Sequence, residues 1–413
     1  MTVHDLRASS AEVAPTELSP VEGASIWRNE GLAERARRVA AVAAQFAEEV
    51  DGQGRFPAEA IAAAKAERLF AIMVPKDLGG EGAGPGDVAE VCYTLGQACA
   101  STAMIYAMHQ VKVACVVRHA APDGWHTGFL RRLADLQWLV ASSTTEGQAG
   151  GNVRSSAAAV APKDGRITLD RDASVISYGD EADAIVTTAR RSAEAAATDQ
   201  VLLVLEKADY ELTRTQTWDT LGMRGTCSTG FALKADADRA QILPPAYEII
   251  HAQSMVPSAH IFWSSAWAGV AAAAVERARR FVRKAARGAG GQLPPAAAYV
   301  AKANTSLRAL RALIATTLGR YETIEGDAEA LADIEFQTAI NLLKVDCSEL
   351  AVTTVMSALR ACGLSGYRND SEFSLGRHLR DVLSSPIMIN NDRILANLAA
   401  ASLVAETPQT LRS

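Results

Sequence analysis

The sequence lacks the features that mark several classes of protein. Its net charge at pH 7 is −6 and its basic residues form no stripe, so nucleic acid is not an expected partner. The six cysteines are scattered without a CxxC pair, which argues against a disulfide framework and against a zinc site. The most apolar stretch, residues 259–275, is interrupted by Ser264 and Ser265 and is too short to span a membrane. We therefore expect a cytoplasmic protein that binds neither nucleic acid nor a membrane.

Motifs of common enzyme classes are also missing. The glycine-rich segment 74–84 has the spacing of neither a dinucleotide GxGxxG turn nor a Walker loop, and no GxSxG elbow of a hydrolase occurs. The histidines do not cluster with acids or cysteines, so no metal site is predicted. The N-terminal residues contain no apolar segment, which argues against a signal peptide. We expect residues 1–25 to form a flexible tail.

The composition indicates a folded chain of more than one domain. Of the 413 residues, 49% are hydrophobic and 21% are charged, which is typical of globular proteins of two or three domains. Apolar residues recur at three- and four-residue steps over residues 31–50, and this periodicity predicts an amphipathic helix. Phe56-Pro57 opens a second helix, and further helical segments follow. Residues 26–137 are therefore predicted to form an N-terminal helical domain.

The pattern changes twice after this domain. Short β-type runs at 156–161, 166–170, 184–189 and 201–206 predict a central antiparallel β-domain over residues 138–247. Long alanine-rich helices are then expected near 253–289, 295–325, 328–362 and 385–406, and they predict a C-terminal four-helix bundle over residues 248–413. The fold class is thus α+β and mainly α.

The stretch 138–152 stands where the helical region gives way to strands. A short apolar run ends there in Thr144, Thr145 and Glu146, and a glycine turn follows at Gly150 and Gly151. Backbone amides freed by glycine, with hydroxyls beside them, suit a planar cofactor that forms hydrogen bonds. Such a loop is weak evidence alone, because Ser/Thr/Gly turns are common at protein surfaces.

The order of the three regions, with five short patterns, resembles the acyl-CoA dehydrogenase family of flavoproteins. The resemblance covers nearly the whole chain after the tail, and its strength lies in the joint order of the patterns. They are Phe56-Pro57 with Val74–Gly84, then Thr144–Gly151, Leu221–Thr226, Gly363–Tyr367 and Leu379–Asp381. The resemblance implies an FAD bound between the β-domain and the bundle, or an FMN if the protein is a monooxygenase.

By this resemblance, the cofactor would contact two groups of residues. The first group would hold the flavin ring and consists of Thr144, Thr145, Gly150, Gly151 and Ser177. The second group matches the family's glycine turn and the positions that touch the rest of the cofactor, and consists of Gly363, Leu364, Gly366, Asn391 and Arg393. Neutral donors at the ring edge would stabilise the negative charge that arrives with a hydride.

The catalytic carboxylate of the family is absent from both of its usual positions. These positions correspond to Ile389 and Ala259, and the nearest acid in the sequence is Asp392. Asp392 is a candidate base, although an aspartate at a helix start also caps free backbone amides. His109 is a candidate proton shuttle on a helix near the flavin, although a lone histidine on a helix is more often structural. The arginine of the family's "R..FG" motif is also missing from 281–291, so the chain resembles a divergent branch.

Three functions remain open at this stage. The first is a dehydrogenase that oxidises an acyl thioester, bound to coenzyme A or to a carrier protein, at its α,β-bond and passes electrons to an acceptor. The second is a monooxygenase on the same fold that uses reduced flavin and O2, and the missing carboxylate suits it. The third is a scaffold without turnover. The resemblance also implies a homotetramer or a homodimer.

Overall fold

The computed structural model describes residues 29–146 and 153–404. The expected tail, residues 1–25, lies outside this part of the chain. Helices form the first region: α1 (Glu30–Gln53), α2 (Ala58–Ala66), α3 (Pro85–Ala98), α4 (Ala100–His119) and α5 (Trp125–Leu136). The Asn29 side chain caps α1 by accepting from the Leu32 amide, and Gly54 ends it in a left-handed conformation with φ of 61°. The predicted helix at 31–50 is therefore confirmed.

Within the described residues, the middle region contains seven strands in two sheets. One sheet has the order β1 (Val140–Ser143), β4 (Ala184–Arg190) and β5 (Gln200–Glu206). The other has the order β2 (Ala161–Lys163), β3 (Arg166–Ile176), β7 (Thr229–Asp238) and β6 (Tyr210–Arg214). All neighbouring strands are antiparallel except β1 and β4, which are parallel. The antiparallel β-domain is thus confirmed, with one parallel pair added to it.

The predicted strand at 156–161 is wrong over all but its last residue. Ala159 forms an isolated bridge, and Ala161 is the first residue of β2. The backbone amides of Ala157 and Ala158 instead donate to the Glu146 carboxylate, at 2.6 and 3.1 Å. Because the carboxylate takes these donors, they are not available to a neighbouring strand.

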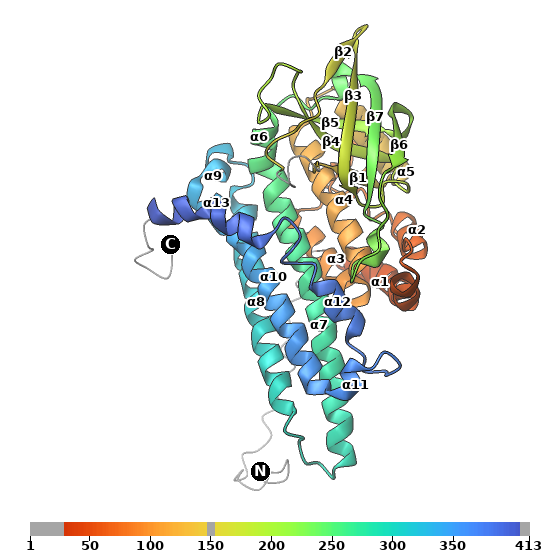
Figure 1. The fold of residues 1–413 in the computed structure, drawn as a ribbon, viewed down its shortest axis with the longest axis vertical. Helices are drawn as coiled ribbons and strands as arrows, with labels where there is room; N and C mark the ends of the chain where they lie inside the picture. Colours follow the sequence, from red (N-terminus) through yellow and green to blue (C-terminus); the bar gives the residue numbers. More distant parts are fainter. Residues whose placement is uncertain (1–28, 147–152, 405–413) are drawn as a thin grey trace.

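The last region is helical again. Its elements are α6 (Tyr247–Ile250), the π-helical segment η5 (His251–Met255), α7 (Val256–Gly288), α8 (Ala297–Ile324), α9 (Ala328–Ala332), α10 (Ile334–Cys362), α11 (Leu364–Tyr367), α12 (Gly376–Val382) and α13 (Asn391–Val404). In Figure 1, α7, α8 and α10 run side by side, and α13 crosses one end of them. The helix predicted at 328–362 is interrupted at Asp333, whose side chain accepts from the amides of Glu335 and Phe336 and starts α10. No helix in the described ranges is long and apolar enough to cross a membrane.

The first and last regions are joined by a close crossing of α3 and α7. At this crossing Gly96 faces Gly269, and neither position has room for a side chain. A Cβ atom on Gly96 would lie 2.3 Å from the Ala266 carbonyl oxygen, and one on Gly269 would lie 2.3 Å from the Tyr93 carbonyl oxygen. The two helices therefore touch through their backbones, and this contact holds the first and last regions together.

Replacing Gly269 with alanine should push α3 and α7 apart. The added methyl group meets backbone that cannot rotate away, so we expect the free energy of unfolding to fall by about 1–3 kcal/mol in thermal or denaturant unfolding. The matched control is Gly319→Ala on the exposed face of α8, where a Cβ meets nothing within 4 Å. That variant should be as stable as the parent or slightly more stable, because alanine favours helix. Equal effects of the two substitutions would contradict this account of the crossing.

Candidate functional site

A cavity of about 1110 Å³ lies where the β-domain meets the helices of the first and last regions. Its walls come from α4, the end of β1, the loop before the 3₁₀-helical turn η3 (Arg224–Thr226), the junction of α6 and α7, α10, and the segment from α12 to α13. These elements are widely separated in the sequence, so the cavity exists only in the assembled fold.

The β-domain contributes a wall of hydroxyl groups. Ser177 Oγ lies 2.7 Å from Ser228 Oγ, which lies 2.7 Å from Thr226 Oγ1. Thr226 uses its proton to donate to the Met223 carbonyl at 2.9 Å. Each hydroxyl has one proton, so Ser228 donates to Thr226 and Ser177 donates to Ser228. In this chain of bonds Ser177 presents its oxygen as an acceptor at the cavity.

The structure brings together four of the predicted cofactor residues. Thr144, Thr145, Ser177 and Arg393 all line the cavity. Gly150 and Gly151 lie outside the described residues. The roles predicted for these residues in binding a cofactor stay predictions.

The other predicted cofactor residues lie elsewhere. The turn that contains Gly363, Leu364 and Gly366 is not part of the cavity wall, and Leu364 is 72% exposed. Asn391 is buried behind the wall, where its side chain bonds Lys344 Nζ at 2.7 Å and Ser348 Oγ at 2.9 Å. Asn391 thereby fixes the start of α13 against α10.

Carboxylates are nearly absent from the cavity. Both positions expected for a catalytic acid, Ala259 and Ile389, line it with apolar side chains. Asp392 lies exposed in the first turn of α13 and is not among the lining residues, so its role as base stays a prediction without support from this geometry. In the described ranges, Glu248 in α6 is the one acid that lines the cavity, and its side chain is exposed.

His109 is buried behind the cavity and not in its lining. Its Nε2 donates to the Phe70 carbonyl at 2.7 Å, and its Nδ1 accepts from the Val140 amide at 3.0 Å. These two bonds hold α4 against the start of β1 and select the neutral tautomer with the proton on Nε2. Burial lowers the pKa of His109 to about 4, which agrees with a neutral ring. Its role as a proton shuttle stays a prediction, and its contacts are those of a structural histidine.

Basic side chains form a second wall of the cavity. Lys112, His251 and His260 come from α4, η5 and α7, and Arg154 comes from the β-domain. Burial lowers the pKa of Lys112 to about 8, and burial together with Arg154 lowers the pKa of His251 to about 3. No motif in the sequence pointed to Lys112. The available signal was a lysine on the same face of α4 as Met104 and Met108.

The π-helical segment η5 determines which side chains this wall presents. A π-turn contains an extra residue, so the positions before it are rotated relative to those after it. The rotation allows Tyr247 and His251 from one side, and Met255 and Ala259 from the other, to face the same cavity. Such segments often occur at functional sites.

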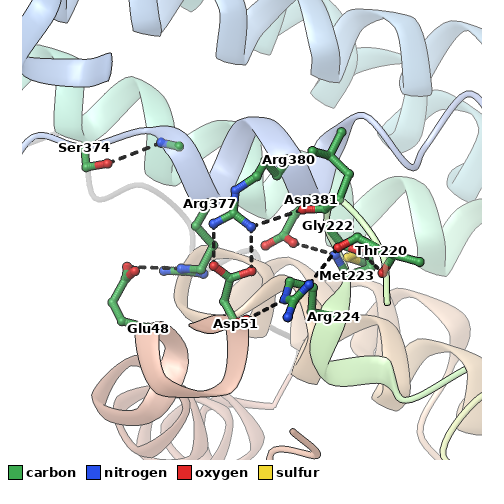
Figure 2. Close-up of polar contacts among 12 residues, drawn as sticks. Glu48, Asp51, Thr220, Gly222, Met223, Arg224, Ser374, Arg377, Arg380 and Asp381 are labelled. Carbon is green, nitrogen blue, oxygen red and sulfur yellow. Dashed lines mark hydrogen bonds and ion pairs between the residues drawn. The ribbon is translucent and has the colours of Figure 1, made fainter. Parts of the chain in front are cut away.

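Figure 2 shows a polar cluster at α12, next to Leu221, Gly222 and Met223 in the cavity lining. Arg380 forms two bonds with the Asp51 carboxylate, at 2.9 and 2.5 Å, and a third with the Leu221 carbonyl at 3.1 Å. Asp381 accepts from the Met223 amide at 2.7 Å. A Cβ on Gly222 would lie 2.1 Å from the Arg380 carbonyl oxygen, so the loop packs directly on α12. Two patterns quoted from the sequence, Leu221–Thr226 and Leu379–Asp381, thus meet in space.

Comparisons with known proteins agree with this architecture. The N-terminal domain model of acyl-CoA dehydrogenase matches residues 28–137, and the C-terminal domain model matches residues 256–404. No curated protein sequence matches the chain.

Solved structures with the same fold include both dehydrogenases and monooxygenases. The FMN-bound dibenzothiophene monooxygenase TdsC from Paenibacillus sp. A11-2 is 18% identical, with a TM-score of 0.81 over 93% of this chain and 100% of its own. Butyryl-CoA dehydrogenase from Megasphaera elsdenii is 17% identical, with a TM-score of 0.77 over 91% of this chain and 98% of its own. KijD3, in complex with FMN and a dTDP-linked amino sugar, is 20% identical, with a TM-score of 0.77 over 92% of this chain and 94% of its own. At these identities the likeness establishes the fold.

Replacing Asp381 with asparagine should change how stability depends on pH. Burial raises the pKa of Asp381 to about 6, above the value of about 4 of an unfolded aspartate. The folded state therefore holds this proton more tightly, and the resulting stabilisation is complete below about pH 4 and is lost as the pH rises through about 6. Asparagine keeps an acceptor for the Met223 amide and does not titrate.

We compare the free energies of unfolding of the parent and of Asp381→Asn. The difference, parent minus variant, should fall by about 1–3 kcal/mol as the pH rises from about 4 to about 7. Denaturant unfolding at several pH values measures this difference. A difference that is flat, or that rises with pH, would contradict the effect ascribed to burial of Asp381.

Proposed function

The chain belongs to the acyl-CoA dehydrogenase family, and from this membership and the cavity we propose that it is a flavin-dependent oxidoreductase that acts on a small molecule. The cavity, of about 1110 Å³, is large enough for a flavin ring and a substrate together. Its hydroxyl wall offers neutral groups that can pair with the polar edge of such a ring. The buried Trp263 Nε1, in the cavity lining, has no hydrogen-bond partner among the described residues and is a further donor.

Thr144, Thr145 and Ser177 are the residues that would hold the ring. When bound, a flavin supplies two electrons at a time, taken from a substrate or given to O2. The cofactor is FAD by the family resemblance. FMN is the alternative, supported by the FMN in TdsC and KijD3.

The reaction that the cavity supports best is oxygenation with reduced flavin and O2. The observation that carries this choice is the apolar side chain at each expected position of the base, Ala259 and Ile389. Oxidation of an acyl thioester needs a carboxylate within hydrogen-bond reach of a weakly acidic α-proton. Oxygenation needs no such base, and an apolar lining keeps water away from the reacting atoms.

A dehydrogenase acting on an acyl thioester is the second candidate, and Glu248 favours it. This residue lies in α6, one turn before the π-helical segment, and is the one acid that lines the cavity in the described ranges. In a dehydrogenase its carboxylate would take the α-proton of the substrate.

We also propose that the protein is a homotetramer or a homodimer. Large apolar side chains are exposed at one end of the bundle, with Met356 at 40%, Leu364 at 72% and Tyr367 at 76%. A second copy of the chain would remove these side chains from water.

The two reactions can be separated with the purified protein. Under anaerobic conditions, a dehydrogenase should lose the absorption of oxidised flavin when one of a panel of acyl thioesters is added. The favoured monooxygenase should show no such bleaching, and with reduced flavin and substrate it should consume one O2 for each product formed. A protein that takes up neither FAD nor FMN would contradict the proposal and favour the scaffold. Mass spectrometry of the released cofactor decides between FAD and FMN.

Replacing Glu248 with glutamine tests the second candidate directly. If Glu248 is the base, anaerobic reduction by a thioester should slow by about 10²–10⁴-fold, because the amide cannot accept the proton. Under the favoured reaction, product formation per O2 consumed should not change. The matched control is Glu211→Gln in β6, an exposed carboxylate that does not line the cavity.

A further inference from the structure

We propose that Lys112 binds a carboxylate of the substrate, so that the small molecule accepted by this cavity is an organic acid with an apolar body. This proposal rests on the proposed function for the identity of the site, and it adds the chemical class of the substrate. It is carried by the position of Lys112, by the charges that surround it, and by the apolar remainder of the cavity.

Lys112 is buried in the cavity wall without a carboxylate partner. Its side chain is 4% exposed, and its ammonium group contacts the Met255 thioether at 2.8 Å. No ion pair within the described ranges includes it. A thioether is a weak acceptor, whereas a buried ammonium group is stable only when it is paired or neutralised. The site is therefore short of one negative charge at this atom.

The groups around Lys112 add positive charge or none. Its own helix contributes the Cys115 thiol, and α6 contributes the Tyr247 hydroxyl. His251 from the π-helical segment and Arg154 from the β-domain line the same cavity, as does His260 from α7. The positive charges of Lys112 and Arg154 both lower the pKa of His251. Burial keeps His251 and His260 neutral, so an anion that enters is attracted by the charges of Lys112 and Arg154. The one acid in the described lining, Glu248, has an exposed side chain.

The rest of this end of the cavity is apolar. Met104, Met108 and Val111 from α4 line it together with Met255 and Val256, where η5 meets α7. An apolar wall beside one buried cation suits a carboxylate on a hydrocarbon or aromatic body, because the body fills the space and the charge is paired at one end. Methionine side chains adapt to bodies of different shape.

The experiment measures binding of a panel of carboxylates, such as hexanoate and benzoate, each beside its primary amide. The protein is used as isolated, and its flavin content is recorded separately by absorbance. Isothermal titration calorimetry should show that a carboxylate binds at least about 10-fold more tightly than its amide. In Lys112→Met this carboxylate should lose about 10- to 100-fold in affinity while the amide keeps its own, because methionine fills the space without charge.

Proton uptake provides a second readout that a structural role would not give. Because burial lowers the pKa of Lys112 to about 8, the free side chain is largely neutral at about pH 9 and must gain a proton to pair with a carboxylate. Calorimetry in two buffers of different ionisation enthalpy should therefore detect uptake by the parent protein and none by Lys112→Met. The variant should fold, because it replaces a buried charge with an apolar group.

The matched control is Lys344→Met. Lys344 is also fully buried and its pKa is also lowered by burial to about 8, but it bonds Asn391 and does not line the cavity. This control should bind carboxylates as the parent does.

Three results would overturn the proposal. They are equal affinity for carboxylate and amide, preference for inorganic phosphate over every carboxylate, and a Lys112→Met protein that loses flavin but keeps its carboxylate binding. The last result would assign Lys112 to the cofactor. A protein without flavin that still binds carboxylates through Lys112 would refute the proposed reaction and leave this proposal standing.

Discussion

The contact of Arg380 and Asp381 with two distant segments is the constraint on which the site depends. Arg380 holds the Asp51 carboxylate at the end of α1, and Asp381 holds the Met223 amide in the β-domain loop. One short helix, α12, thereby ties the first, middle and last regions of the chain together (Figure 2). Arg380 and Met223 also line the cavity, so the same bonds that join the regions set the position of one wall. Because Gly222 leaves no gap over α12, this wall has little freedom to move.

The overall fold could be predicted from the sequence because its signals are long or ordered. The alanine-rich periodic segments that became α7, α8 and α10 extend over many turns, and the order of helical, β and helical regions is specific. The strand predicted at 156–161 failed because a distant side chain, Glu146, takes the backbone donors there. No local pattern reports such a bond. The sequence also does not predict the π-helical segment η5, because one extra residue changes the helical periodicity of apolar residues too little to be detected.

The site could be predicted only in part. Thr144, Thr145 and Ser177 were predicted because they stand at strand ends within a recognisable order. The structure places them in the cavity lining, and their role in binding a cofactor stays a prediction. Lys112 was missed because a lysine on a helix normally reaches water with its charged end. Only the tertiary structure shows that α4 packs against β1 and α7, so that this lysine is buried in the cavity wall. The described part of the cavity lining has neutral hydroxyls, several cationic side chains and a single acid, Glu248.

The π-helical segment η5 adds one residue between α6 and α7, and this residue sets the rotation of α6 relative to α7 about the helix axis. Successive residues of an α-helix are about 100° apart, so deleting one position within His251–Met255 would restore regular α-helical bonds and turn everything before it by about that angle. The helix would be locally better bonded, yet Tyr247 and His251 would leave the cavity as a pair. The number of residues in η5 therefore decides which side chains of this segment face the cavity, more than the identity of any one side chain does. A relative that is one residue shorter here would share the fold and present a different surface to its substrate.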